Sequence, residues 1–123
     1  MKPRESGSPK PPSPEEIQER VRRLRIRVRV LRDVMASYHI DSVSGKPATM
    51  LDCVETLQAE IWQRNHIIEI GKVTREGAAR IEKEIGKIHE QKMILDDILP
   101  KNEPAKEVLT DMEAEIARLE STT

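Results

Sequence analysis

The sequence is poor in aromatic residues: its 123 residues include no Phe, one Trp and one Tyr. Apolar residues make up 37% of the chain and charged residues 35%, which leaves little material for a thick globular core. A mixture rich in Glu, Lys, Arg, Ile and Leu is typical of long, thin helices. We therefore expect a small all-α protein of elongated shape.

Cysteine and long apolar runs are equally scarce. Cys53 is the only cysteine, so the chain cannot form an internal disulfide. No apolar run reaches the roughly 18 residues that span a bilayer, and no signal-peptide core follows Met1. These features predict an intracellular protein, in the cytoplasm or nucleus, with no membrane span.

The sequence also lacks the motifs of common catalytic and cofactor sites. His39, His66 and His89 are far apart and follow no HExxH or histidine-plus-cysteine zinc spacing, and no GxGxxG or GxxxxGK[ST] loop is present. His66 fits a packed or interface position, and Cys53 has no neighbouring base to activate it. We predict no enzyme activity, no cofactor and no metal.

The first 13 residues, MKPRESGSPKPPS, form a Pro/Ser-rich tail with nothing apolar after Met1, and we predict that this tail is disordered. A helical domain over residues 14–121 follows. Ser13, Pro14 and Glu16 have the order of a capping box with proline in the first turn, which predicts that a helix begins there.

The stretch LRIRVRV, residues 24–30, alternates like a half-buried strand, but a longer pattern contains it. Seven apolar residues recur at alternating steps of four and three, as in a heptad seam: Ile17, Val21, Leu24, Val28, Leu31, Met35 and Tyr38. We therefore predict a helix over about 14–40.

Two further helices are predicted, over about 47–99 and 104–121, because helical apolar spacing continues to Leu99 and resumes after Pro104. The seam of the middle helix changes register between Ile61 and Ala78, a segment that contains Gly71 and Gly77. We predict one continuous helix through this segment; the alternative is a break into two shorter helices, since each interior Gly costs about 1 kcal/mol relative to Ala.

These lengths predict an elongated three-helix, coiled-coil-like protein in which a long middle helix has an antiparallel partner at each end. The first helix would fold back on residues 47–73, and the last helix on residues 82–99. The arrangement resembles small helical subunits and chaperones of eukaryotic complexes, including the three-helix tubulin-folding cofactor A family. Such coiled-coil hairpins host unrelated functions, so the resemblance is one of architecture.

A second apolar stripe lies off the main seams and predicts a partner-binding surface, since exposed apolar patches commonly mark interfaces. Its members are Ile26, Val30, Val34, Trp62, Ile70 and Val73. A tryptophan beside aliphatic residues is a typical interface anchor. The alternative is that the last helix covers this stripe within one chain.

The arginines of the first helix permit two readings. Residues 1–32 hold ten Lys/Arg against four acidic residues, and residues 33–123 hold eleven against eighteen. Four arginines flank the seam and are candidates for contact with an anion or nucleic acid: Arg22, Arg25, Arg29 and Arg32. The other reading is that acidic residues of a partner helix meet them, as flanking charges do in coiled coils.

Together these features predict a non-enzymatic structural or adaptor subunit of a helical complex, a scaffold that acts through coiled-coil packing in a homo- or hetero-oligomer. The alternative is a nucleic-acid-associated protein that uses the arginine-rich first helix.

Overall fold

We describe a computed structural model of the chain, covering residues 12–40, 42–43, 45–98 and 101–122. These residues form the helices α1 (Pro14–Ser37), α2 (Met50–Glu69), α3 (Arg75–Asp96) and α4 (Ala105–Glu120). Two short strands, β1 (Ser42–Val43) and β2 (Lys46–Pro47), pair antiparallel between α1 and α2. The predicted all-α class is confirmed, whereas residues 1–11 of the predicted disordered tail lie outside the described residues.

The first helix begins at the predicted capping box. The Ser13 hydroxyl accepts a hydrogen bond from the Glu16 amide at 3.2 Å, and the Glu16 carboxylate accepts one from the Ser13 amide at 3.2 Å. Two of the amides left free at the helix start are thereby bonded. At its other end α1 stops at Ser37, three residues before the predicted Ile40.

The prediction of one continuous helix over 47–99 is wrong, and so is the three-helix arrangement built on it. The chain turns between α2 and α3, where Gly71 has a φ of +67°. Thr74 then caps α3, because its hydroxyl accepts a hydrogen bond from the Gly77 amide at 3.0 Å. Gly77 therefore belongs to the first turn of α3 and takes no part in the break.

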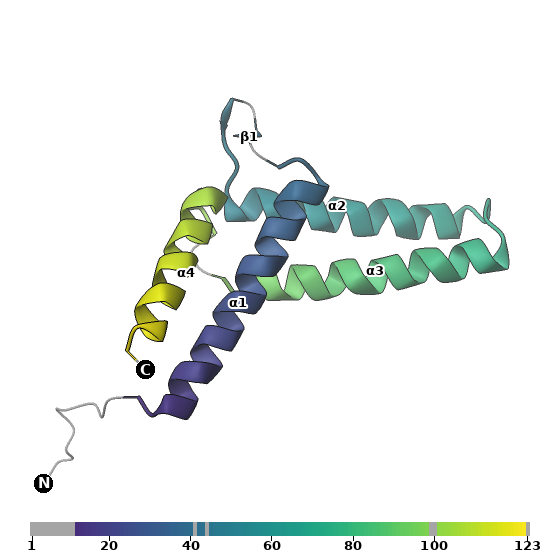
Figure 1. Cartoon of the computed structure of the whole chain (residues 1–123). Helices are drawn as coiled ribbons and strands as arrows, with labels where there is room; N and C mark the ends of the chain where they lie inside the picture. Colours follow the sequence, from purple (N-terminus) through teal and green to yellow (C-terminus); the bar gives the residue numbers. More distant parts are fainter. Residues whose placement is uncertain (1–11, 41, 44, 99–100, 123) are drawn as a thin grey trace, which may run out of the picture.

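The helices form two antiparallel pairs that cross (Figure 1). α2 and α3 make a hairpin, whereas α1 runs alongside α4 and passes across α3. Both predicted helix pairings are wrong: α1 does not fold back on residues 47–73, and α4 does not fold back on residues 82–99. The seam of α1 packs instead against α4.

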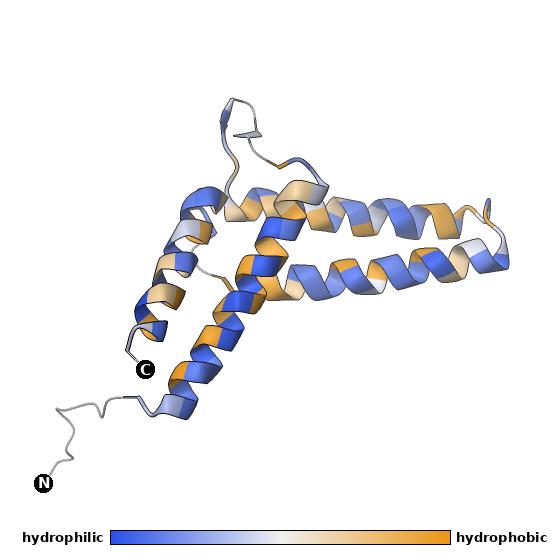
Figure 2. Cartoon of the chain, in the orientation of Figure 1, coloured by the Kyte–Doolittle hydropathy of each residue, from blue (hydrophilic) through white to orange (hydrophobic). Residues whose placement is uncertain are grey.

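The core lies where the two pairs meet, and every helix contributes to it. The largest fully buried side chains come from three helices: Leu31 and Val34 of α1, Met50, Cys53 and Leu57 of α2, and Leu95 of α3. The smaller Ala105 of α4 is fully buried as well. A smaller cluster of Ile17, Val21 and Leu119 joins the far ends of α1 and α4. Figure 2 shows apolar and hydrophilic residues alternating along each helix, as amphipathic packing requires.

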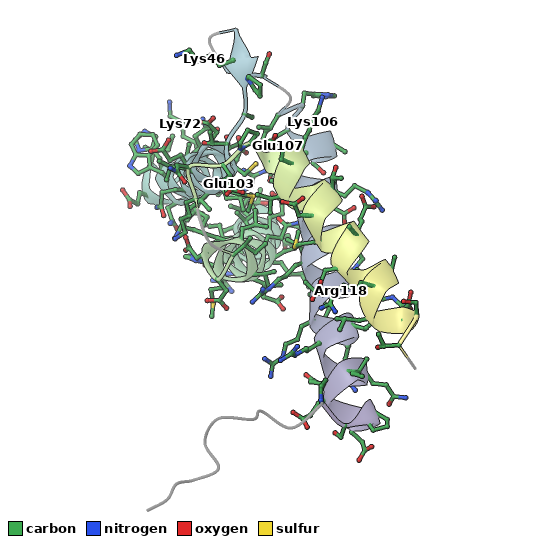
Figure 3. The ribbon with its side chains drawn as sticks, turned by 90° about the vertical axis from the view of Figure 1, so that its left-hand side faces the viewer. Lys46, Lys72, Glu103, Lys106, Glu107 and Arg118 are labelled. Atoms are coloured by element: carbon green, nitrogen blue, oxygen red, sulfur yellow. The ribbon has the colours of Figure 1, made fainter. Side chains whose placement is uncertain are left out.

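The connection between α3 and α4 docks onto the start of α2. Amides of Met50 and Leu51 donate to the carbonyls of Glu103 and Lys101, at 3.0 and 2.9 Å. These bonds satisfy groups that the first turn of a helix leaves without intrahelical partners. Figure 3 shows Glu103, Lys106 and Glu107 together at this junction, where α4 begins.

Candidate functional site

An exposed apolar stripe runs along the outside of α2. Leu51, Trp62 and Ile70 are 46%, 63% and 48% exposed, respectively. Trp62 lies eleven residues after Leu51, close to three helical turns, and Ile70 lies eight residues further on. These three side chains, with His66 between the last two, form what we call the α2 stripe.

Trp62 is held in place within this stripe by His66, one turn along the helix. The two rings stack with their centroids 5.2 Å apart and their planes 5° apart. A stacked ring restricts the rotamers of Trp62, so its large apolar face is already ordered before anything binds. Pre-ordered anchors lose less conformational entropy on association.

The structure divides the six predicted partner-binding residues among different places. Trp62 and Ile70 lie on the α2 stripe, and Val73 is half-buried in the turn between α2 and α3. Ile26 and Val30 are half-buried on α1, where Val30 packs against the core. The last member, Val34, was a wrong prediction.

Val34 is fully buried, so its side chain is already packed inside this chain. The sequence pattern also missed three exposed apolar residues, Leu51, Ile67 and Met93, the last of them 68% exposed. Leu51 could have been predicted from its spacing, since it lies about three helical turns from Trp62. Met93 has no such spacing, because it stands alone on the outer face of α3.

Two of the four flanking arginines meet acidic residues of α4. Arg25 pairs with Glu120, and Arg32 pairs with Glu113. Both pairs join α1 to α4 across the antiparallel seam. The sequence-based interpretation in which acids of a helix meet these arginines is therefore confirmed at two positions, with the helix supplied by the same chain.

For the other two arginines, the described residues show no ion pair to α4. Arg22 pairs there with Glu19 of its own helix at 2.9 Å, and its side chain is 69% exposed. Arg29 is exposed, and within the described part of the chain no ion pair is found for it. These two positive charges are the ones that remain accessible to an anionic partner.

Groups with catalytic or metal-binding chemistry are dispersed. The three histidines lie at the end of α1, in α2 and in α3, and the described residues contain no group of three potential metal ligands. Burial raises the pKa of the Cys53 thiol to about 11, with a smaller contribution from the negative charge of Asp52. A thiol with so high a pKa is almost wholly protonated at neutral pH, and thiols react as thiolates.

Among helices formed by the described residues, none has the length and apolarity needed to cross a bilayer. Comparison with protein-family profiles, with curated proteins and with solved structures gives no match for this chain. Any assignment of function therefore depends on the surfaces described above.

Proposed function

We propose that this protein is a non-enzymatic structural or adaptor subunit, and that its α2 stripe packs against helices of a protein partner in an intracellular complex. The observation that carries the proposal is the exposure of Trp62, 63% in the free chain, within a stripe that also exposes Leu51 and Ile70. Isolated exposed apolar residues are common on monomers, but a large exposed tryptophan near exposed aliphatic residues is typical of an interface.

Covering Trp62 would supply part of the energy that specific association needs, since association itself costs about 4–15 kcal/mol in lost freedom of motion. A buried tryptophan removes about 150–250 Å² from water. At about 25 cal/mol per Å², covering its exposed part stabilises a complex by about 2–4 kcal/mol.

The thinness of the hairpin supports the same proposal. From residue 62 to residue 87, all of which the structure describes, no side chain is buried. This outer part of α2 and α3 consists of two helices with no third element across them (Figure 1). A partner helix on the α2 stripe would supply the missing layer.

The nucleic-acid alternative has weaker support from the same structure. Arg25 and Arg32 already carry ion pairs to α4, so two of the four predicted contacts are partly neutralised. Bases would have few stacking partners, since Tyr38 is the only aromatic residue on the α1 segment and is itself half-buried. Among the described residues Arg22 and Arg29 make no ion pair to another helix, so they remain available to an anionic partner.

The proposal is tested by placing charges in the stripe. Trp62→Glu with Ile70→Glu should abolish partner binding or lower the mass in solution, because two carboxylates would have to be desolvated at the interface. Sedimentation velocity of the purified chain reports self-association, and affinity isolation from cells that express it reports a different partner. Circular dichroism should show that helical content is retained, since both side chains are exposed.

Met93→Glu serves as the matched control, because Met93 is as exposed as Trp62 but lies on α3. It should leave both mass and partner binding unchanged. If the double variant keeps the wild-type mass and isolates the same proteins, the α2 stripe is not the interface and the proposal fails.

A further inference from the structure

A groove of about 550 Å³ opens on the flank of α1, away from the α2 stripe. The buried Ile17 and Val21 form its floor, the half-buried Ile26 lines one side, and Arg22, Arg25 and Arg29 bring positive charge to it. Its only acidic lining residue is Glu120, which is paired with Arg25. The groove is therefore apolar and basic together, a combination that suits a ligand with both apolar and acidic groups.

The chain itself shows what kind of partner α1 accepts. α4 lies antiparallel along one flank of α1 and borders the groove at Glu120 (Figure 1), and its Glu113 and Glu120 pair with Arg32 and Arg25. In both helices the paired residues are seven positions apart, which is one heptad. Between the two glutamates α4 presents apolar side chains to α1, including Leu119. The partner of this flank is thus an acidic amphipathic helix.

The groove repeats this arrangement without the partner. Arg22 and Arg29 are also seven positions apart, with Ile26 between them on the helix surface. Neither is ion-paired to another element among the described residues, since Arg22 reaches only Glu19 of its own helix. We infer that this groove binds an acidic amphipathic helix of a protein partner, with its apolar face over Ile26 and carboxylates one heptad apart at Arg22 and Arg29.

Two other occupants fit the groove less well. The N-terminal segment of this chain carries Lys2, Arg4 and Lys10 against Glu5, so its charge would repel the arginines. A nucleic-acid backbone would match the arginines, but it would leave the apolar lining without a partner, and that lining contains no aromatic ring for a base. An acidic helix with an apolar face uses both features.

The test uses a defined probe and the full chain. The probe is a fluorescein-labelled peptide of three heptads, with leucine at a and d, glutamate at e and g and alanine elsewhere, kept too dilute to self-associate. Fluorescence anisotropy should show binding to the wild type that weakens with salt. Arg22→Glu with Arg29→Glu should weaken it roughly tenfold or more, because attraction becomes like-charge repulsion.

The matched control is Arg75→Glu with Arg80→Glu, which makes the same change in net charge at two exposed arginines of α3. This variant should bind the glutamate peptide within about twofold of the wild type. A second control exchanges the charges: a peptide with lysine at e and g should bind the Arg22→Glu, Arg29→Glu variant better than it binds the wild type. Restored binding to the exchanged peptide shows that the variant is folded and that the contact is direct.

Four results would overturn the inference. They are no binding of the glutamate peptide, equal weakening in both double variants, equally tight binding of polyglutamate or of a short DNA duplex, and self-association of the chain that is lost only in the Arg22→Glu, Arg29→Glu variant. The third result would assign the groove to anions in general, and the fourth would assign it to a second copy. None depends on the α2 stripe, so failure here and failure of the proposed function are separable.

Discussion

Asp96, at the end of α3, links this helix to the connection that follows it. Its two carboxylate oxygens accept hydrogen bonds from Lys101 at 3.0 Å and from Lys92 at 3.1 Å. The hydrogen bond from Lys101, and then that from Lys92, lower the pKa of Asp96 below its usual value. Lys101 also offers its carbonyl to the Leu51 amide, so this carboxylate helps to hold the α3–α4 connection against α2.

Asp96→Asn should lower the free energy of unfolding by roughly 0.5–1 kcal/mol at neutral pH, as expected for a partly exposed ion pair. Because the folded pKa is depressed, the stabilisation is fully present above the unfolded pKa and disappears as the pH falls through the lower folded value. Urea unfolding at neutral pH and at a pH well below the usual aspartate pKa measures this.

The neighbouring Asp97→Asn variant is the control, since Asp97 is exposed and no ion pair is found for it among the described residues. It should leave stability nearly unchanged at both pH values. An equal loss in the two variants, or a loss for Asp96→Asn that persists in acid, would contradict the assigned role of Asp96.

At the scale of the elements, the break between α2 and α3 is the feature that sets the architecture. It allows α3 to fold back on α2, and the hairpin is then fixed by Arg64, whose guanidinium reaches Glu84 across the pair at 3.0 Å. Gly71 makes the break possible, because its φ of +67° is one that residues with a Cβ rarely adopt.

Two glycine variants distinguish this break from a continuous helix. Gly71→Ala should destabilise the chain by about 1–2 kcal/mol, the usual penalty for a Cβ in the left-handed region. Gly86→Ala should stabilise it by about 0.5–1 kcal/mol, because Gly86 is exposed within α3 and an added Cβ meets nothing within 4 Å. Thermal unfolding of both variants gives the comparison. Stabilisation by Gly71→Ala would contradict the break and support one helix over 47–99.

The elements that sequence reasoning predicted correctly are those with local causes. The capping box at Ser13 and the heptad seam from Ile17 depend on residues within one or two turns of each other. The break was missed because Ile70 and Val73, three residues apart, continue a helix-like spacing through it. Thr74 became recognisable as a cap only once the turn at Gly71 was known, since caps and ordinary helical threonines share the same residue type.

The pairing of the helices was not predictable from their seams. The seam of α1 can pack against any antiparallel amphipathic helix, and each of the other helices offers one. Contacts distant in sequence decide the choice, such as the hydrogen bond from the Ala105 amide to the Ala48 carbonyl at 2.8 Å, which places α4 at the start of α2. The candidate site was partly mispredicted for the same reason. Val34 was assigned to the exposed stripe because the helices that bury it could not be identified from the sequence.

At the scale of the whole molecule, the α2–α3 hairpin extends beyond the crossing of the two pairs as an arm (Figure 1). Its fully buried residues, such as Leu57 and Leu95, lie near the crossing, whereas the outer end carries exposed Ile67 and Ile70. Figure 2 shows apolar residues gathered at this end of α2. The molecule thus combines a packed junction with a thin arm whose outer face is suited to a partner.

The central claim is that Trp62 is covered in the working assembly, and hydroxyl-radical footprinting with mass spectrometry tests it directly. The tagged full-length chain is labelled within the assembly isolated gently from cells, and again after dilution until it is monomeric. We predict that Trp62 reacts several-fold more slowly in the assembly, while Met93 on α3, as exposed as Trp62 in the free chain, reacts equally in both. A rate of Trp62 oxidation in the assembly equal to that of the monomer would contradict the account.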